Sequence, residues 1–139
     1  MNSPICDLSL LLRSMEPVLN PGTYAFVSVP NEEKLASVQV AASIRGAEGL
    51  SAVIAEADAI ALSLPILFRA AWITLSVNSD LQAVGFTAAF ATALAQAGIS
   101  CNIIAGARHD HIFVPVEHAA EAMVVLNQLQ STAQAASTV

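Results

Sequence analysis

The chain has 139 residues, a length that fits one compact domain or two very small ones with a sizeable core. Hydrophobic residues make up 55% of it and charged residues only 12%, so much of the chain must be buried in helix and sheet layers or in a subunit interface. A formal net charge of −6 with only 5 lysines and arginines argues against nucleic acid as a partner, because nucleic-acid binding needs clustered cations. Because so much of the chain is apolar and so little is charged, we expect a homo-oligomer, with a dimer favoured.

Cysteine usage and the apolar segments indicate a cytoplasmic protein with no membrane partner. Cys6 and Cys101 lie far apart without a CxxC pair, which is typical of a reducing compartment. The N-terminus has no basic start before its short apolar patch, so it is not a secretory signal. The apolar run 59–77 is interrupted by Pro65 and contains Arg69, which favours a helix end and a buried strand over a membrane span.

The first half of the chain begins with a predicted short helix. Its apolar residues from Leu8 to Met15 follow helical spacing, Asp7 is placed to cap it and Pro17 to stop it. After the turn signal at residues 21–22, the expected elements are a strand over 23–29, a loop over 30–34, hairpin arms over 38–44 and 50–55, and a helix near 57–64.

The second half has a clearer strand pattern, followed by a polar loop and a long helix that Gly98 ends. Pro115 fits the first turn of a last helix. The expected elements are a strand over 71–77, a loop over 78–80, a helix over about 84–97, strands over 99–105 and 111–114 around a turn at 106–110, and a helix from 115 to about 130.

A faint internal repeat relates the two halves. Residues 26–29 echo 74–77, and residues 52–62 echo 113–123. Two consecutive β(α)ββα units predict an α+β fold of two side-by-side ferredoxin-like modules, with antiparallel sheets and helices on one face. The boundaries expected are a first module over 1–66 that carries an extra N-terminal helix, a second module over 67–130, and a flexible tail over 131–139.

Three segments of the second half, 78–86 (NSDLQAVGF), 98–106 (GISCNIIAG) and 109–115 (HDHIFVP), resemble the small bacterial tandem ACT-domain proteins. Residues 21–26 and 48–51 add matching pieces, so the resemblance covers nearly the whole chain. It implies two ACT modules and a regulatory protein that binds an amino acid at an interface between modules, without naming the ligand. The first-half hairpin connection, 45–49, is less acidic than the resemblance leads us to expect.

The loop from Asn78 to Val84 leads from a strand into a helix, where backbone N–H groups and the helix dipole suit a carboxylate. Its polar residues are also good helix caps, so capping alone is the competing interpretation of their side chains. Gly85 permits close backbone approach. The candidate ligand-binding residues are Asn78, Ser79, Asp80, Leu81, Val84, Gly85, Asn102, Ile103, His109, Asp110 and His111.

Four of these candidates have more than one interpretation. Asn102 either hydrogen-bonds a ligand or satisfies a neighbouring loop. Asp110 either faces a ligand ammonium group, with His109 or His111 lining the pocket, or accepts backbone hydrogen bonds in a turn. A weak metal site through the two histidines is a further alternative, although a structural zinc site needs four ligands and we expect no metal cofactor.

No motif in the chain indicates catalysis. Cys101 is predicted to be buried in a strand, and the sequence contains no GxSxG elbow, GxGxxG fingerprint or P-loop. We therefore expect a cytoplasmic, non-catalytic regulatory protein that binds a small ligand, most simply an amino acid, without a cofactor. The alternative is a structural module that oligomerises through a sheet face containing Trp72 and Thr74.

Overall fold

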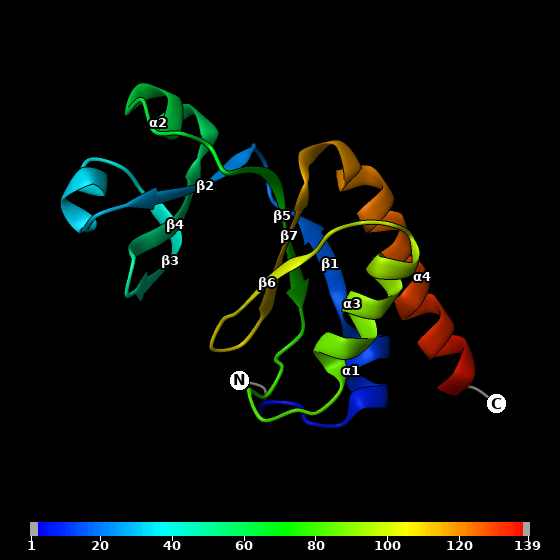
Figure 1. Cartoon of the computed structure of the whole chain (residues 1–139). Coiled ribbons are helices and arrows are strands. Elements are labelled where there is room, and N and C mark those ends of the chain that lie inside the picture. Colours follow the sequence, from blue (N-terminus) through cyan, green and yellow to red (C-terminus); the bar gives the residue numbers. More distant parts are fainter. Residues whose placement is uncertain (1–2, 138–139) are drawn as a thin grey trace. The chain divides into compact units, whose positions relative to one another are not determined.

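The computed structural model describes residues 3–137, and the chain divides into two compact units, each an assembly of helices on an antiparallel sheet (Figure 1). The first unit is residues 21–71, and the second unit combines residues 1–20 with 72–139. The predicted α+β class is confirmed. No helix among the described residues is long and apolar enough to cross a membrane.

The first unit is built on strands β2 (Tyr24–Val29), β3 (Val40–Gly46) and β4 (Gly49–Ala55), with β4 in the middle. Alternate residues of β2 and β4 point into a core that η1 (Glu32–Leu35) and α2 (Glu56–Ala61) cover. The core residues are Ala25, Val27, Val29, Leu35, Leu50, Ala52, Ile54 and Ala59. The hairpin and the short helix lie close to where the sequence predicts them.

Strand β5 (Phe68–Ser76) belongs to both units, because the boundary between them falls within it. Its first residues pair with β2, and Ile73–Ser76 pair with β1 (Glu16–Leu19) in the second unit. The hairpin of β6 (Asn102–Ala105) and β7 (Asp110–Pro115) completes the second unit's sheet, with β7 next to β5.

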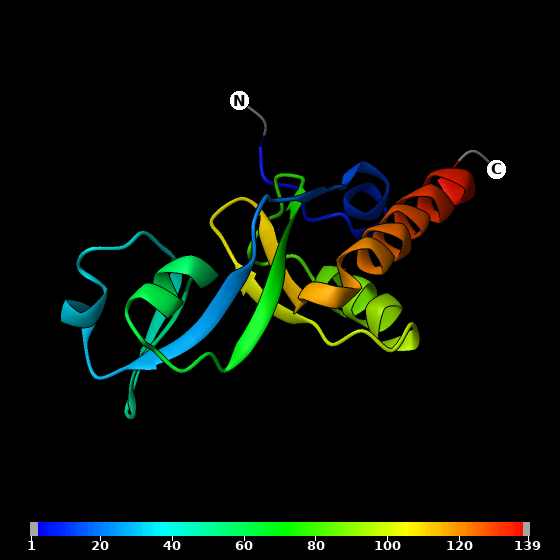
Figure 2. The same cartoon turned by 90° about the horizontal axis from the view of Figure 1, so that it is seen from above.

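Three helices cover one face of the second unit's sheet: α1 (Leu8–Ser14), α3 (Phe86–Gln96) and α4 (Ala119–Ser137), the last after a short turn, η2 (Val116–His118). In Figure 2 they gather beside the strands, α1 in blue, α3 in yellow-green and α4 in orange and red. Helix α4 contacts both α1 and α3. Apolar residues fill the core between these layers, among them Leu11, Met15, Ile73, Leu75, Phe86, Phe90, Leu94, Ile112, Val114 and Leu126.

The N-terminal residues are packed differently from our expectation. We assigned the first helix to a module over 1–66, but α1 packs on α4, and β1 pairs with β5 inside the second unit. We also predicted no strand at β1, because Pro17 was expected only to stop a helix. A proline fits there because β1 pairs on one side alone among the described residues.

The C-terminal tail is another difference. We expected a flexible tail from residue 131, whereas α4 continues to Ser137; the last two residues of that tail lie outside the described residues. The side chains of Gln130 and Gln134 both donate hydrogen bonds to the carbonyl oxygen of Arg13, at 3.2 and 3.1 Å. That carbonyl belongs to the last turn of α1, where the helix leaves its own acceptors unsatisfied. The two helices therefore hold each other's ends in place.

Candidate functional site

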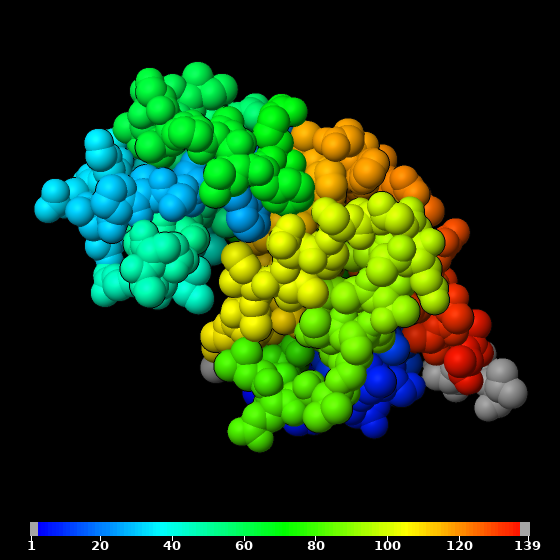
Figure 3. All heavy atoms as spheres, viewed as in Figure 1, coloured from blue at the N-terminus to red at the C-terminus, as the bar shows by residue number. Residues whose placement is uncertain are grey.

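The loop of residues 77–85, between β5 and α3, is held from both sides by backbone hydrogen bonds. Ser79 N–H donates to the carbonyl of Arg108 in the β6–β7 turn, at 2.7 Å. On the other side, Asp80 N–H donates to the carbonyl of Ile5 at 3.0 Å, and Ile5 N–H donates to that of Asn78 at 2.8 Å. Figure 3 shows the loop, in green, beside the hairpin, in yellow.

The carboxylate of Asp80 is used inside this loop. Its Oδ1 accepts a hydrogen bond from the backbone N–H of Gln82 at 2.8 Å. This bond, together with a hydrogen bond from the Cys6 thiol, lowers the pKa of Asp80 from its ordinary value. Asp80 is therefore an ionised turn-former whose lone pairs already have local donors.

Helix α3 begins with an open N-terminus. Capping by polar side chains of the preceding loop was one of two interpretations of the sequence, but the N-cap is Gly85, in the left-handed conformation at φ +94°, and no side chain among the described residues caps the helix. The backbone N–H groups of its first turn, residues 86–88, are consequently left without a side-chain acceptor. Such a helix end carries partial positive charge and suits an anion.

Asp110, the first residue of β7, contributes a buried carboxylate beside this helix end. It is only 8% exposed, and no hydrogen bond to its carboxylate is present among residues 3–137. Burial raises the pKa of Asp110, against the smaller opposing influence of His111 and His109. Because the carboxylate lines the pocket and has no protein donor among the described residues, it is available to pair with a cation or a hydrogen-bond donor of a ligand.

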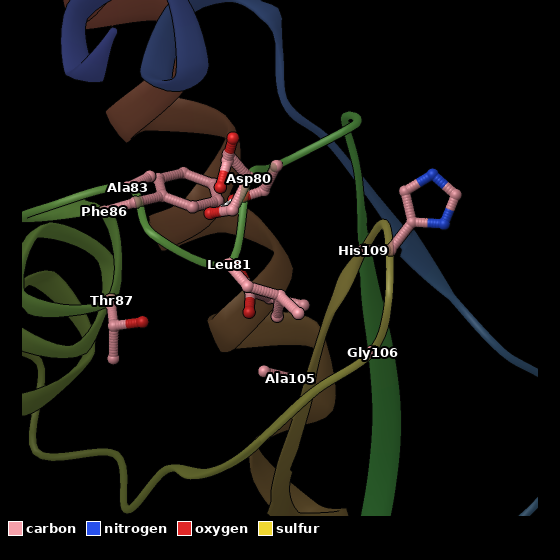
Figure 4. Close-up of a pocket in the computed structure, with 10 residues that line it drawn as sticks. Asp80, Leu81, Ala83, Phe86, Thr87, Ala105, Gly106 and His109 are labelled. Atoms are coloured by element: carbon pink, nitrogen blue, oxygen red, sulfur yellow. Dashed lines mark hydrogen bonds between the residues drawn. The ribbon is translucent and has the colours of Figure 1, made fainter. Parts of the chain in front are cut away.

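These features surround a single pocket of about 80 Å³ (Figure 4). Figure 4 shows Thr87 of α3 on one side of Leu81 and the β6–β7 hairpin, with Ala105 and Gly106, on the other. The lining residues are Ser79, Asp80, Leu81, Ala83, Phe86, Thr87, Ala105, Gly106, His109 and Asp110. The pocket thus combines a helix N-terminus and a buried carboxylate within one small space.

The predicted site residues divide into two sets. The lining includes Ser79, Asp80, Leu81, His109 and Asp110 but not Asn78, Val84, Gly85, Asn102, Ile103 or His111. The ring of His109 extends away from the labelled pocket residues in Figure 4. Val84 is 84% exposed, and Asn102 lies on the face of β6 opposite to the pocket residue Ala105, because successive strand residues alternate.

His111 lies on the opposite face of β7 from Asp110, because successive strand residues alternate. Its Nδ1 accepts a hydrogen bond from the indole N–H of Trp72 at 3.0 Å. An indole only donates, so Nδ1 carries no proton and the proton of the neutral ring is on Nε2. The hydrogen bond to the indole engages Nδ1, which disfavours the metal alternative, and no cluster of three potential metal-ligating side chains occurs among the described residues.

The candidate residues did not include five that line the pocket, namely Ala83, Phe86, Thr87, Ala105 and Gly106. Phe86 is buried in the core, at 2% exposed, and also reaches the pocket. Thr87 had a signal that could have been used, since a hydroxyl in the first turn of a helix lies next to its free N–H groups.

Replacing Gly85 by alanine tests the importance of the helix start. A Cβ at this position would lie 3.2 Å from Cδ2 of Leu8, and its φ of +94° is unfavourable for alanine. We expect Gly85→Ala to lower the free energy of unfolding by about 1 kcal/mol and to weaken ligand binding, because the helix N-terminus must shift. Urea titration and calorimetry measure the two effects.

Gly98→Ala is the matched control. Gly98 ends the same helix with φ +75°, but a Cβ there would meet nothing within 4 Å. This variant should lose stability through backbone strain and keep its ligand affinity. Equal binding by both variants would show that the start of α3 does not contact the ligand.

Family comparisons place this pocket within a known module. Two family models, both described as ACT domain, match the chain, one over residues 3–71 and the other over residues 68–128. All pocket residues lie inside the second match. No curated protein sequence matches the chain.

Solved structures give the same architecture. A Vibrio cholerae protein, VC0802, described as of unknown function and as a possible transport protein, is 44% identical, with a TM-score of 0.81 over 88% of this chain and 95% of that one. The regulatory subunit of aspartate kinase from Thermus thermophilus, in its ligand-free form, matches with 14% identity and a TM-score of 0.64 over 85% of this chain and 97% of that one. Aspartokinase III of E. coli, in complex with aspartate and ADP, gives 15% identity and a TM-score of 0.57 over 86% of this chain and 33% of that one.

Proposed function

The chain belongs to the ACT-domain family, with two ACT modules in tandem, and from this premise we propose that it is a regulatory protein that binds a free α-amino acid in the pocket of the second module. ACT domains generally serve as amino-acid-binding regulatory modules. The observation that carries the proposal is the buried carboxylate of Asp110 beside the uncapped start of α3. One supplies a negative charge and the other a partial positive charge, which together match a zwitterion.

Each end of the ligand has a partner of the right sign. The ammonium group of the ligand donates a hydrogen bond to the carboxylate of Asp110. Asp110 is only 8% exposed, and its carboxylate has no other donor among the described residues. The carboxylate of the ligand accepts hydrogen bonds from the backbone N–H groups of residues 86–88, and the hydroxyl of Thr87 lies close by. No lysine or arginine lines the pocket, so the helix N-terminus serves as the anion site.

A thermal-shift screen of the twenty amino acids tests the proposal. We expect one amino acid, or a small group of similar ones, to raise the melting temperature, because a ligand that binds only the folded state stabilises it. Asp58→Asn is a suitable control, since Asp58 lies on α2 in the first unit and does not line the pocket. A folded protein that responds to no amino acid at millimolar concentration would contradict the proposal.

The protein is proposed to act without catalysis, in the cytoplasm. Burial raises the pKa of Cys101 to about 11, so its thiol stays protonated at neutral pH and is a poor nucleophile. The two cysteines, Cys6 and Cys101, are both free thiols, which is typical of a reducing compartment. Regulation then requires a partner protein that senses the ligand-bound form.

A homo-oligomer, with a dimer favoured, is also part of the proposal. Among the described residues of the first unit, η1 and α2 pack on one face of its sheet. The other face presents aromatic residues, and the rings of Phe26 and Phe68 pack edge to face there with centroids 5.4 Å apart. Ile44 on β3 is 71% exposed on the same face. Burying such apolar surface favours self-association. Sedimentation equilibrium at micromolar concentration should give a dimer, and a strict monomer would contradict this part.

A further inference from the structure

His111 is the centre of a hydrogen-bonded cluster on the sheet face opposite the pocket. The indole N–H of Trp72 and the hydroxyl of Thr74 both lie at its Nδ1, at 3.0 and 3.1 Å. The side-chain amide of Asn20 donates to Thr74 Oγ1 at 2.9 Å. Asn20 also donates through its backbone N–H to the carbonyl of Trp72, at 2.8 Å. The cluster therefore connects β7, β5 and the end of β1.

The cluster lies at the two points where the chain leaves and re-enters the second unit. Asn20 is the last residue of that unit's N-terminal segment, and Trp72 is the first residue of its C-terminal segment. The hydrogen bonds of Asn20 to Trp72 and Thr74 join these two segments directly.

The hydrogen bonds of the cluster are compatible with only one charge state of His111. Since the indole of Trp72 only donates, it needs an unprotonated Nδ1 as its acceptor. An imidazolium has N–H groups at both nitrogens, so in protonated His111 the Nδ1–H and the indole N–H of Trp72 are both donors and cannot form a hydrogen bond with each other. The ring also packs on Trp72, with centroids 5.6 Å apart, which leaves it little freedom to turn away.

The neighbour of His111 along β7 is the pocket carboxylate. Asp110 faces the pocket and His111 faces the cluster, and Gly106 lies near both, since it lines the pocket and a Cβ built on it would be 3.1 Å from Nε2 of His111. We propose that His111 is a switch that couples the charge of the pocket at Asp110 to the hydrogen bonds joining Asn20, Trp72 and Thr74. The ligand-dependent half of this switch rests on the proposed function.

The titratable groups whose charges act on His111 come from its own hairpin. They are His109 and Asp110, while β5 contributes the uncharged Trp72 and Thr74 and β6 places Ile104 opposite. Burial and His109 lower the pKa of His111, and Asp110 raises it to a smaller extent. A ligand ammonium at Asp110 cancels that carboxylate's field, so binding favours neutral His111 and an intact cluster. By linkage, protonation of His111 weakens the binding of the ligand by the same factor as the bound ligand weakens the binding of the proton to His111.

A pH titration of the ligand-free protein tests the switch. Trp72 is the single tryptophan of the chain, so its fluorescence and its indole N–H resonance report this cluster alone. Two-dimensional ¹H–¹⁵N spectra of the imidazoles give the tautomer and the pKa of each histidine. We expect His111 to be the Nε2–H tautomer at neutral pH, and the Trp72 signals to change together with its protonation at a pH below 6.5, the ordinary value.

Three variants separate the switch from a merely structural role. Asp110→Asn should move the His111 and Trp72 transitions together to lower pH. His111→Gln, whose amide oxygen still accepts from the indole, should keep the indole bond and abolish the transition. His118→Asn, a histidine on η2 outside the cluster, should leave it unchanged. A Trp72 transition that persists in His111→Gln, or a Nδ1–H tautomer, would overturn the proposal.

The ligand-dependent half has its own readout. The amino acid that stabilises the protein in the thermal-shift screen should lower the pKa of His111 when it is added, and an unchanged His111 pKa in the saturated protein would overturn the coupling. If no amino acid binds, the proposed function fails, while the ligand-free titration still decides whether His111 controls the cluster.

Discussion

Asp110→Asn should lower the affinity for the amino acid by about tenfold to a hundredfold, which is the loss expected when one hydrogen bond to a charged group is removed. The same change should raise the stability of the folded protein at neutral pH. The affinity falls because a neutral amide replaces the carboxylate that pairs with the ligand ammonium. The stability rises because the variant removes a buried charge that has no donor among the described residues. Calorimetry and urea unfolding measure the two effects.

The sign of the stability change follows from the pKa. The folded state raises the pKa of Asp110, so the ionised carboxylate costs stability at pH values above its folded pKa. That cost declines in the wild type as pH falls from the folded pKa toward the ordinary pKa, and below the ordinary pKa the two proteins should become equally stable. A variant that loses stability at neutral pH would show that Asp110 has a structural donor.

Asp80→Asn is the matched control in the same pocket, and its expected effect on stability has the opposite sign to that of Asp110→Asn. Hydrogen bonds from Gln82 and Cys6 lower the pKa of Asp80, so its ionised form contributes stability above its ordinary pKa. That contribution is lost as pH falls through the folded pKa. We therefore expect Asp80→Asn to lower stability at neutral pH and Asp110→Asn to raise it. A stability change of the same sign in both variants would contradict the different roles assigned to the two carboxylates.

Phe90→Ala should destabilise the second unit by about 3–5 kcal/mol, a large fraction of the stability of a small domain. Phe90 is fully buried on α3, and its ring contacts that of Phe86 edge to face, with centroids 5.2 Å apart. Truncation leaves a cavity under the first turn of the helix, where Phe86 lines the pocket. Urea unfolding followed by Trp72 fluorescence reports on this unit specifically.

Thr92→Ala on the same helix is the control for Phe90→Ala. Thr92 is exposed, so this change should alter stability by no more than about 0.5 kcal/mol. Phe90→Leu, which retains most of the apolar volume, should lie between the two. A loss of less than about 1 kcal/mol in Phe90→Ala would mean that α3 is not packed as the structure shows.

Much of the fold was predictable because its strands and long helices have clear periodicity. The apolar run ending in Val77 and the alternation through Ile112 and Val114 produce β5 and β7 where they were expected. The packing of α1 on α4 was not predictable, since it joins residues more than a hundred positions apart and leaves no local signal. Strand β1 was missed because Pro17 is compatible with a strand only at a position paired on one side.

The candidate site was predictable only in part. Asp80 and Asp110 stand out in sequence as polar residues at the ends of apolar strands, and both line the pocket. Their different surroundings depend on tertiary contacts, namely the donors from Gln82 and Cys6 for one and burial for the other. The separation of Asp110 from His111 follows from strand alternation alone, and we missed it because the segment was first considered as a turn.

Titration calorimetry with the amino acid found by screening and with two blocked analogues tests the central claim most directly. The N-acetyl analogue lacks the ammonium group that Asp110 binds, and the carboxamide analogue lacks the carboxylate that the start of α3 binds. Each should bind the wild type about tenfold to a hundredfold more weakly, and the N-acetyl penalty should vanish in Asp110→Asn. Equal binding of the amino acid and both analogues to the wild type would contradict the assignment of this pocket as an amino-acid site.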